Sequence, residues 1–547
     1  MTRRITVLIG IISIATSPWT TYDPINPLKF LLLGVCGSTC LVFLIINRKE
    51  FQFNKVMLSL IAIFISQTLI STVFSGSSLT QGIFGYYGRN FGLLTWIMLF
   101  ALMIYFSVAQ EFQILLSSLL IVGVISLLYS YVQYFGIDPA PWQNNFNAII
   151  GFLGNPNFQS SFLGLFLIVV IGNLLQEFRN TKYLILYSIL LLATVQLILT
   201  SGSIQGLFVS LVGLGSLAMY FVYAKKYYKI FWSLTVVGAI FFLNFVFAIV
   251  GLGPLSGYIH RGTLAIRGDY WLAAMSMAKA NLLTGVGPDQ YGTWYRFYRH
   301  QESLTRVNSE VVSDSAHNGF LDFAANLGFV AFLAYVLLII YAIVLVGRSI
   351  NHDSKIDRTH ATLVALFMGF QSQLLISPNQ IGLAVWGWVF LGAMYGYKRP
   401  EVDKKVKQMK LSLRADQRRS SFNQLSLALA PMIGTLVGFA LAFPIFYSSM
   451  QFRTALVKAD AIRIIAAATV WPRNEEVLSF STNLLLSNGL QEQGLKLVNS
   501  ALQEFPNSFE LLRSKKSYKW ITEVESKEIQ SNLHRLDPLN PEYAPKG

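Results

Sequence analysis

Residues 330–346 read VAFLAYVLLIIYAIVLV, a run of apolar side chains without a charge. A helix needs about 20 mainly apolar residues to cross the hydrocarbon core of a bilayer, and this run with its apolar flanks is long enough. Comparable runs occur along most of the chain, and only 13% of its 547 residues are charged. Soluble globular proteins carry roughly 25% charged residues. The sequence therefore predicts an all-α, polytopic bundle of transmembrane helices.

We expect about 13 transmembrane helices, oriented by the loops between them. The expected spans are residues 6–17, 28–46, 56–74, 91–109, 114–135, 159–175, 183–200, 204–223, 230–251, 319–347, 360–377, 381–397 and 424–447. Basic residues gather in alternate loops, which are therefore predicted to face the cytoplasm. The chain is then a multi-pass protein of the cytoplasmic (inner) membrane with a cytoplasmic N-terminus, whether or not its short first span is a cleaved signal peptide. The net charge of +15 reflects this topology and not nucleic-acid binding.

Three extracytoplasmic loops, at residues 75–90, 136–157 and 252–317, and an extracytoplasmic tail follow from this topology. A membrane domain, residues 1–448, carries a large loop at 252–318, and a polar tail covers residues 449–547. Within the tail, residues 488–506 (NGLQEQGLKLVNSALQEFP) resemble half of a tetratricopeptide repeat. About three repeats are the usual minimum for an independent solenoid, and the tail has room for fewer. We expect a small helical appendage, which is either a plain helical hairpin or a docking site for a protein partner.

The polar chemistry lies in the loop and not in the spans. The spans hold few ionisable side chains, with Asp322 as the nearest exception, whereas transporters place such groups inside their bundles. The loop contains Arg261, Arg267, Arg296, Arg299 and Arg306, with His260, His300 and His317. Guanidinium groups bind phosphate in a bidentate manner, so the loop predicts a lipid-linked substrate with a phosphate or pyrophosphate head. The alternative for any single arginine is contact with lipid phosphates. The sequence has no zinc-ligand pattern, Walker loop or nucleophile elbow, so no metal or cofactor is expected.

One segment of the loop, residues 313–328, reads SDSAHNGFLDFAANLG. Ser313, Asp314 and Ser315 are good N-cap residues, so we expect a long helix with His317 in its first turn. The positive end of a helix disfavours an imidazolium ion, and a neutral imidazole can accept a proton. His317 is thus a candidate general base, and the alternative is a histidine that only hydrogen-bonds at a helix start.

Five motifs carry a family resemblance. They are His317-Asn318-x9-Gly328, Arg267-x3-Trp271 followed by Leu283-Thr-Gly-Val-Gly287, Gly88-Arg89-Asn-Phe-Gly92, Gly154-Asn-Pro-Asn157 and Asp23-Pro-Ile-Asn-Pro-Leu-Lys29. In this order they resemble the O-antigen ligase superfamily, which includes O-antigen polymerases and bacterial O-oligosaccharyltransferases. The resemblance covers roughly residues 1–400. Thr284 and Ala331 stand where the family pattern often has another residue.

The resemblance implies a metal-independent membrane glycosyltransferase. Such an enzyme uses a lipid-linked oligosaccharide as its donor, in which the glycan is attached to undecaprenyl pyrophosphate. It transfers the glycan to a hydroxyl group of an acceptor, which is a glycan, a lipid or a protein. It implies that His317 is the catalytic base and that Arg89, Arg267, Arg261 and Asn318 bind substrate. Ligase and polymerase activities are both compatible with the motifs. A lipid-linked glycan transporter and a membrane scaffold are the competing classes, and replacing His317 distinguishes them from an enzyme.

Overall fold

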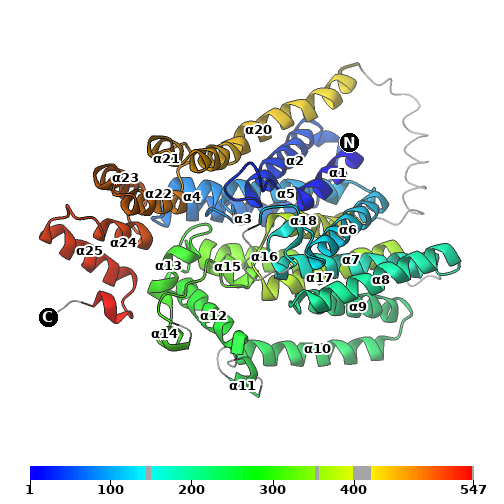
Figure 1. The fold of residues 1–547 in the computed structure, drawn as a ribbon. Coiled ribbons are helices and arrows are strands. Elements are labelled where there is room, and N and C mark those ends of the chain that lie inside the picture. Colours follow the sequence, from blue (N-terminus) through cyan, green and yellow to red (C-terminus); the bar gives the residue numbers. More distant parts are fainter. Residues whose placement is uncertain are drawn as a thin grey trace.

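A computed structural model describes residues 1–142, 149–249, 252–254, 256–259, 262–306, 308–350, 356–397 and 421–544. These ranges form helices and loops, and no β-strand occurs in them. A large helix bundle carries a smaller group of helices against one of its ends (Figure 1). The predicted all-α class is confirmed.

Among the described residues, ten helices are long and apolar enough to cross a membrane. They are α2 (Asn26–Ile46), α3 (Lys55–Phe74), α6 (Phe112–Tyr134), α7 (Pro156–Glu177), α8 (Thr181–Thr200), α9 (Gln205–Ala224), α10 (Tyr228–Ile249), α16 (Phe329–Ser349), α17 (Arg358–Ile376) and α20 (Ser421–Lys458). Three further expected spans fall on shorter helices, α1 (Thr2–Ile14), α5 (Leu93–Val108) and α18 (Ile381–Gly396). The multi-pass architecture is thus supported by about ten long helices, fewer than the number expected from the sequence.

The expected span at 319–347 is wrong as a single helix. The structure divides it at Gly328 into α15 (Gly319–Leu327) and α16. Gly328 has a φ of 86°, and a Cβ there would lie 2.6 Å from the carbonyl oxygen of Leu283. The N–H of Phe329 donates to the carbonyl of Leu282 at 2.9 Å. The helix ends because another backbone segment packs against it, at a distance and a φ that favour glycine.

The same backbone segment joins two helices of the loop, α12 (Gly262–Ala280) and α13 (Tyr291–Tyr298). Val286 and Gly287 donate their N–H groups to the carbonyls of Ala325 and Asn326, at 2.9 and 3.0 Å. A Cβ on Gly285, where φ is 63°, would lie 2.3 Å from the Asn326 carbonyl oxygen. The glycines of this motif therefore hold the loop on α15.

The centre of the bundle is apolar but not free of charge. Trp386 and Trp388 of α18 are fully buried. Lys29, in α2, is also fully buried and was not counted among the ionisable residues of the spans. Its ammonium group donates to the carbonyls of Ile12 at 3.1 Å, Ser13 at 3.0 Å and Ala15 at 2.7 Å. Lys29 thus caps the C-terminal end of α1, where carbonyl groups lack helical partners.

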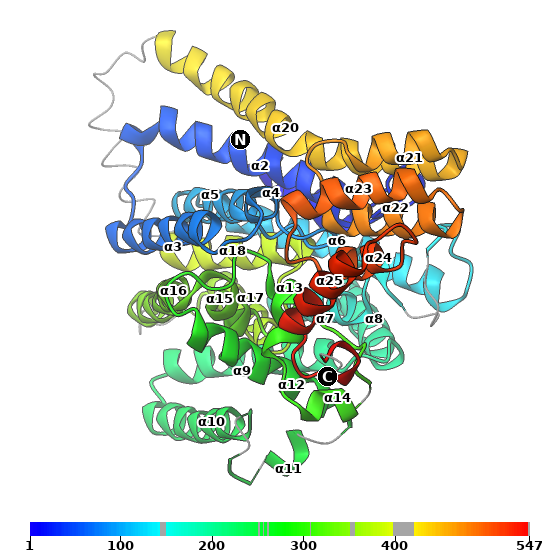
Figure 2. The ribbon, with the colours of Figure 1, turned by 90° about the vertical axis from the view of Figure 1, so that its left-hand side faces the viewer.

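The loop and the tail lie at the same end of the bundle (Figures 1 and 2). The remaining helices are α4 (Leu79–Phe84), α11 (Ser256–Ile259), α14 (Glu302–Arg306), α21 (Ala461–Ala468), α22 (Glu475–Ser487), α23 (Gln491–Glu504), α24 (Phe509–Lys516) and α25 (Glu523–Leu536), with 3-10 turns at Arg48–Glu50, Gly151–Leu153 and Pro541–Tyr543. The loop and the tail thus share one end of the bundle (Figures 1 and 2). Which side of the membrane this end faces stays a prediction.

The tail packs against both the bundle and the loop. Helix α20 passes through residue 448 without interruption, so one helix links the membrane domain to the tail. Gln81 donates to Glu475 at 2.9 Å, and Thr80 donates to Glu504 at 3.0 Å. On the loop side, Arg299 donates to Asp537 at 2.7 Å. The tail is therefore part of the surface that surrounds the loop.

Candidate functional site

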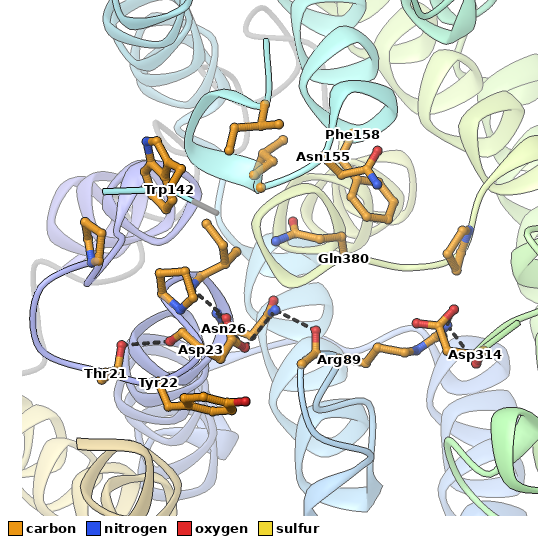
Figure 3. Close-up of a pocket in the computed structure, with 18 of the residues that line it drawn as sticks. Thr21, Tyr22, Asp23, Asn26, Arg89, Trp142, Asn155, Phe158, Asp314 and Gln380 are labelled. Atoms are coloured by element: carbon orange, nitrogen blue, oxygen red, sulfur yellow. Dashed lines mark hydrogen bonds and ion pairs between the residues drawn. The ribbon is translucent and has the colours of Figure 1, made fainter. Parts of the chain in front are cut away.

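A cavity of about 420 Å³ lies at the end of the bundle that carries the loop and the tail. We call it the central cavity. Residues from segments far apart in the chain line it: Pro18, Thr21, Tyr22, Asp23, Pro24, Ile25, Asn26, Gly88, Arg89, Pro141, Trp142, Ile150, Leu153, Gly154, Asn155, Phe158, Asp314, Ser315, His317, Pro378, Asn379, Gln380 and Arg453. In Figure 3, Trp142 and Asn155 lie on one side, with Asp23 and Arg89 on the other. The cavity therefore brings together four of the five sequence motifs.

Within the described part of the chain, four helices begin at the central cavity. Helix α2 begins after Ile25, α7 after its N-cap Asn155, α15 after its N-cap Asn318 and α18 after its N-cap Gln380. Each helix N-terminus carries a partial positive charge and backbone N–H groups that point outward. At α2 the carboxylate of Asp23 already accepts from the N–H groups of Ile25 and Asn26. The N-termini of α7, α15 and α18 are therefore the ones that favour an anionic group in the cavity.

Two helices end near the central cavity, and cations cap both ends. Lys29 caps α1, as described above, close to the lining residue Pro18. Arg267 donates from Nη1 to the carbonyl of Ile376, the last residue of α17, at 3.0 Å. Helix C-terminal ends are partly negative, so these contacts offset the charge that would repel an anion.

His317 lines the cavity in an unusual backbone conformation, with a φ of 50°. The expected N-cap residues are wrong: Asn318 is the N-cap of α15, and its Oδ1 accepts from the N–H groups of Phe320 at 3.0 Å and Leu321 at 3.1 Å. His317 therefore precedes the helix and does not lie in its first turn. A non-glycine residue at positive φ is strained, and such strain is common at functional sites.

The surroundings of His317 favour its neutral form. Its ring stacks on the ring of Tyr270, with centroids 5.5 Å apart and planes at 24°. Burial lowers the pKa of His317 to about 4; Asp314 opposes this shift, while Arg267 and Arg89 add to it. The imidazole is therefore uncharged at neutral pH and able to accept a proton.

Arg89 is held in place by carboxylates. Its Nε donates to Asp289 at 2.9 Å, and its Nη atoms lie 3.7 Å from Asp314 and 3.8 Å from Asp322. Burial alone would lower the pKa of Arg89, but these three charges raise it above its ordinary value. Asp289 also accepts from the N–H groups of Tyr86 at 2.8 Å and Phe91 at 3.1 Å. Asp289 thus fixes both the Arg89 side chain and the segment that carries it.

The predicted site residues have different positions in the structure. Arg89 and His317 line the central cavity. Arg267 lies beside it as the cap of α17, and Asn318 caps α15. Arg261 and the neighbouring His260 lie outside the described residues.

Three of the loop arginines that the sequence suggested for phosphate binding are ion-paired in the structure. Arg306 pairs with Asp269 at 2.7 Å, and Arg299 pairs with Asp537 at 2.7 Å. Arg296 also lies 3.5 Å from Asp537. These partners are distant in sequence, so the sequence alone did not show that these loop arginines are ion-paired and not free to bind phosphate.

Sequence reasoning missed Asp289, Tyr270 and Arg453. Tyr270 lies inside the Arg267-x3-Trp271 motif, so the motif itself was an available signal. Asp289 follows closely after the glycine motif that ends at Gly287, and this proximity was a weaker signal. Arg453 lies in the helix that leads into the tail, far from every motif, and nothing in the sequence connects it with the cavity.

The described residues contain no group of three or more histidine, cysteine, aspartate or glutamate side chains placed to hold a metal ion. The arrangement instead offers a neutral imidazole beside a cavity that favours anions. Such a site can bind an anionic group and remove a proton from a neighbouring hydroxyl.

Comparison with known proteins places part of the chain in a family. A family model described as O-Antigen ligase matches residues 186–336. The match includes the loop, Arg267, His317 and Gly328, and it ends before the tail. The likeness of the tail to tetratricopeptide repeats therefore stays a prediction. A search of curated proteins found no match. Residues 186–336 form an O-antigen ligase family domain, as the motifs of the sequence had indicated.

Proposed function

We propose that the protein is a membrane glycosyltransferase that moves a glycan from undecaprenyl pyrophosphate to an acceptor hydroxyl. The observation that carries the proposal is the position of His317, a neutral imidazole at a cavity where helix N-termini meet. Membership of the O-antigen ligase family supports a reaction on lipid-linked glycans. The site lies, on this proposal, on the extracytoplasmic side of the cytoplasmic membrane.

In the proposed reaction, the acceptor oxygen attacks the anomeric carbon of the donor glycan. Its proton passes to a ring nitrogen of His317 as the new carbon–oxygen bond forms. The bond between the anomeric carbon and the phosphate oxygen breaks, and pyrophosphate leaves on the lipid carrier with the bonding electrons. Attack opposite the leaving group inverts the anomeric carbon. Ligase and polymerase differ only in the molecule that supplies the hydroxyl.

The leaving group gains negative charge as it departs, and stabilising that charge lowers the barrier. The N-termini of α7, α15 and α18 supply fixed dipoles for this purpose. Arg267 is proposed to contribute its charge from beside the cavity. The positive charge of Arg89 is shared with three carboxylates, so its proposed contribution is to shape the site and to donate hydrogen bonds. Asn318 uses its Oδ1 in the helix cap and has only its amide NH₂ to offer to a substrate.

Transfer by the His317→Ala variant tests the proposal. We expect a loss of about 100- to 10,000-fold in kcat, the usual contribution of a general base, with donor binding nearly unchanged. The matched control is His300→Ala, because His300 is in the same loop but bonds Ser276 and does not line the central cavity. Both variants are first checked for folding in detergent. Wild-type transfer by His317→Ala would refute the base role, and absence of transfer by wild-type protein with every acceptor class would refute the function.

A further inference from the structure

Arg453 reaches the central cavity from the only helix that joins the bundle to the tail in the described chain. It lies near the end of α20 and lines the cavity together with Tyr22 and Asp23. The preceding residue, Phe452, packs edge-on against the ring of Tyr22, with centroids 4.9 Å apart. One helical turn earlier, Ser449 accepts from the N–H of Tyr22 at 3.1 Å. These contacts hold the backbone that carries the Arg453 side chain at the cavity wall.

Within the described ranges, the side chain of Arg453 forms no ion pair and no hydrogen bond. Its Nε is buried without a hydrogen-bond partner in the same part of the structure. Asp23, which lines the cavity together with Arg453, has its own hydrogen-bond partners. Its carboxylate accepts from the N–H groups of Ile25 at 2.8 Å and Asn26 at 3.3 Å at the start of α2.

The other described arginines of the loop and of the cavity lining are different. Arg89, Arg296, Arg299 and Arg306 all pair with carboxylates, and Arg267 caps a helix. A buried guanidinium N–H without a partner is unfavourable unless a ligand satisfies it. Five N–H donors in a planar fork match the oxygens of a phosphate group better than those of any neutral group. Arg453 is therefore placed, and left available, to bind an anion.

We propose that Arg453 binds a phosphate oxygen of the lipid-linked donor, so that the helix leading into the tail forms part of the donor site. The N-termini of α7, α15 and α18 favour the same anion from other directions. The identity of the donor rests on the proposed function, whereas anion binding by Arg453 rests on the geometry alone. The C-terminal region thereby contributes a substrate-binding residue and not only a surface for partners.

Binding of farnesyl pyrophosphate to the full-length protein in detergent is the direct test. We expect Arg453→Ala to raise its Kd by about 10- to 100-fold, the usual effect of losing a charge-assisted hydrogen bond. Arg453→Lys should recover part of this loss, because lysine keeps the positive charge but lacks the planar guanidinium group that binds two oxygens at once. The control is Arg463→Ala, since Arg463 lies in the tail, is exposed and pairs with Asp460 at 3.3 Å.

Two further ligands define what the site recognises. Farnesyl phosphate should depend on Arg453 in the same way, and a farnesyl carboxylate should bind weakly to all variants. Equal binding of phosphate and carboxylate would overturn the assignment to a phosphate. Unchanged Kd in Arg453→Ala, or no binding by wild-type protein, would overturn the proposal. If binding depends on Arg453 but no glycan is transferred, the proposed function fails and the anion site stands.

Discussion

The sharpest prediction concerns the buried ion pair between the loop and the tail. Asp537, at the end of α25, is fully buried, and both its oxygens accept from Nη2 of Arg299, at 2.8 and 2.7 Å. Arg299 also donates to the carbonyl of Ser309 at 2.7 Å. Ser309 precedes the segment that leads to Asp314 and His317. Asp537→Asn keeps the shape of the side chain but removes the charge that holds Arg299 there.

The magnitude follows from burial. The side chains of Arg299 and Asp537 are both 0% exposed, so the variant leaves a buried guanidinium without its anionic partner. Breaking a buried pair in this way costs about 3–5 kcal/mol. Arg296 loses less, because it also lies near Glu510 and stacks over Phe509 at 4.2 Å. A cost of this size weakens docking of the tail on the loop by roughly two to three and a half orders of magnitude.

Two measurements check this expectation. Amide hydrogen exchange of residues 308–317 and of α25 should become faster in Asp537→Asn, and trypsin should cleave the tail sooner. The rate of glycan transfer should fall in the same variant, because the segment that follows Ser309 also positions His317. The control is Glu523→Gln, whose side chain is 82% exposed and pairs with Lys527 on the surface. Exchange and cleavage at wild-type rates in Asp537→Asn would refute the idea that this pair holds the loop to the tail.

Four other outcomes are expected. Because the pKa of His317 is lowered to about 4, this base stays neutral above that pH, whereas burial raises the pKa of Asp322, beside Arg89, to about 7. In the Asp322→Asn variant the rate of transfer with saturating donor should therefore be flat from about pH 5 to 7, and a fall centred near 6.5 in that variant would contradict the shift of His317. Gly328→Ala should lower the melting temperature more than Gly202→Ala, because both positions have positive φ but only Gly328 faces a backbone oxygen at 2.6 Å; equal losses would remove the packing argument. Alkaline phosphatase fused after Lys458 should be active and one fused after Lys225 inactive, and the reverse pattern would invert the topology. Transfer should persist in excess chelator, and a loss reversed by added metal would show that a metal ion stabilises the leaving group.

The predicted elements were most accurate where the signal is local. Runs such as 330–346 are long enough to span a bilayer by themselves, so composition and length located the helices. The prediction failed at Gly328, where the break depends on the carbonyl of Leu283, a residue 45 positions earlier in the chain. Helix ends are set by tertiary contacts as well as by propensity.

The candidate site was predicted in part for a similar reason. The motif that contains His317 is continuous in sequence, so its chemistry could be inferred before its position was known. The acidic partners of Arg89 and Arg299 could not be inferred from the sequence, because Asp289 and Asp537 lie about 200 or more residues away from them. Arginines that looked alike in the loop thus turned out to be ion-paired or to cap a helix.

The amino-acid sequence by itself indicated a helical protein whose helices are long and apolar enough to cross a membrane, because burial in lipid requires long apolar helices. It placed the polar chemistry in one loop, whereas the cavity draws its polar residues from several segments. Its motifs also indicated the O-antigen ligase family, whose model matches residues 186–336, because motif residues are close in sequence. Only the tertiary structure decided which charges remain available. The convergence of α2, α7, α15 and α18 on one cavity, and the arrival of Arg453 beside them, depend on packing between distant segments. The electrostatic character of the site is the sum of those distant charges and dipoles, and no local pattern encodes that sum.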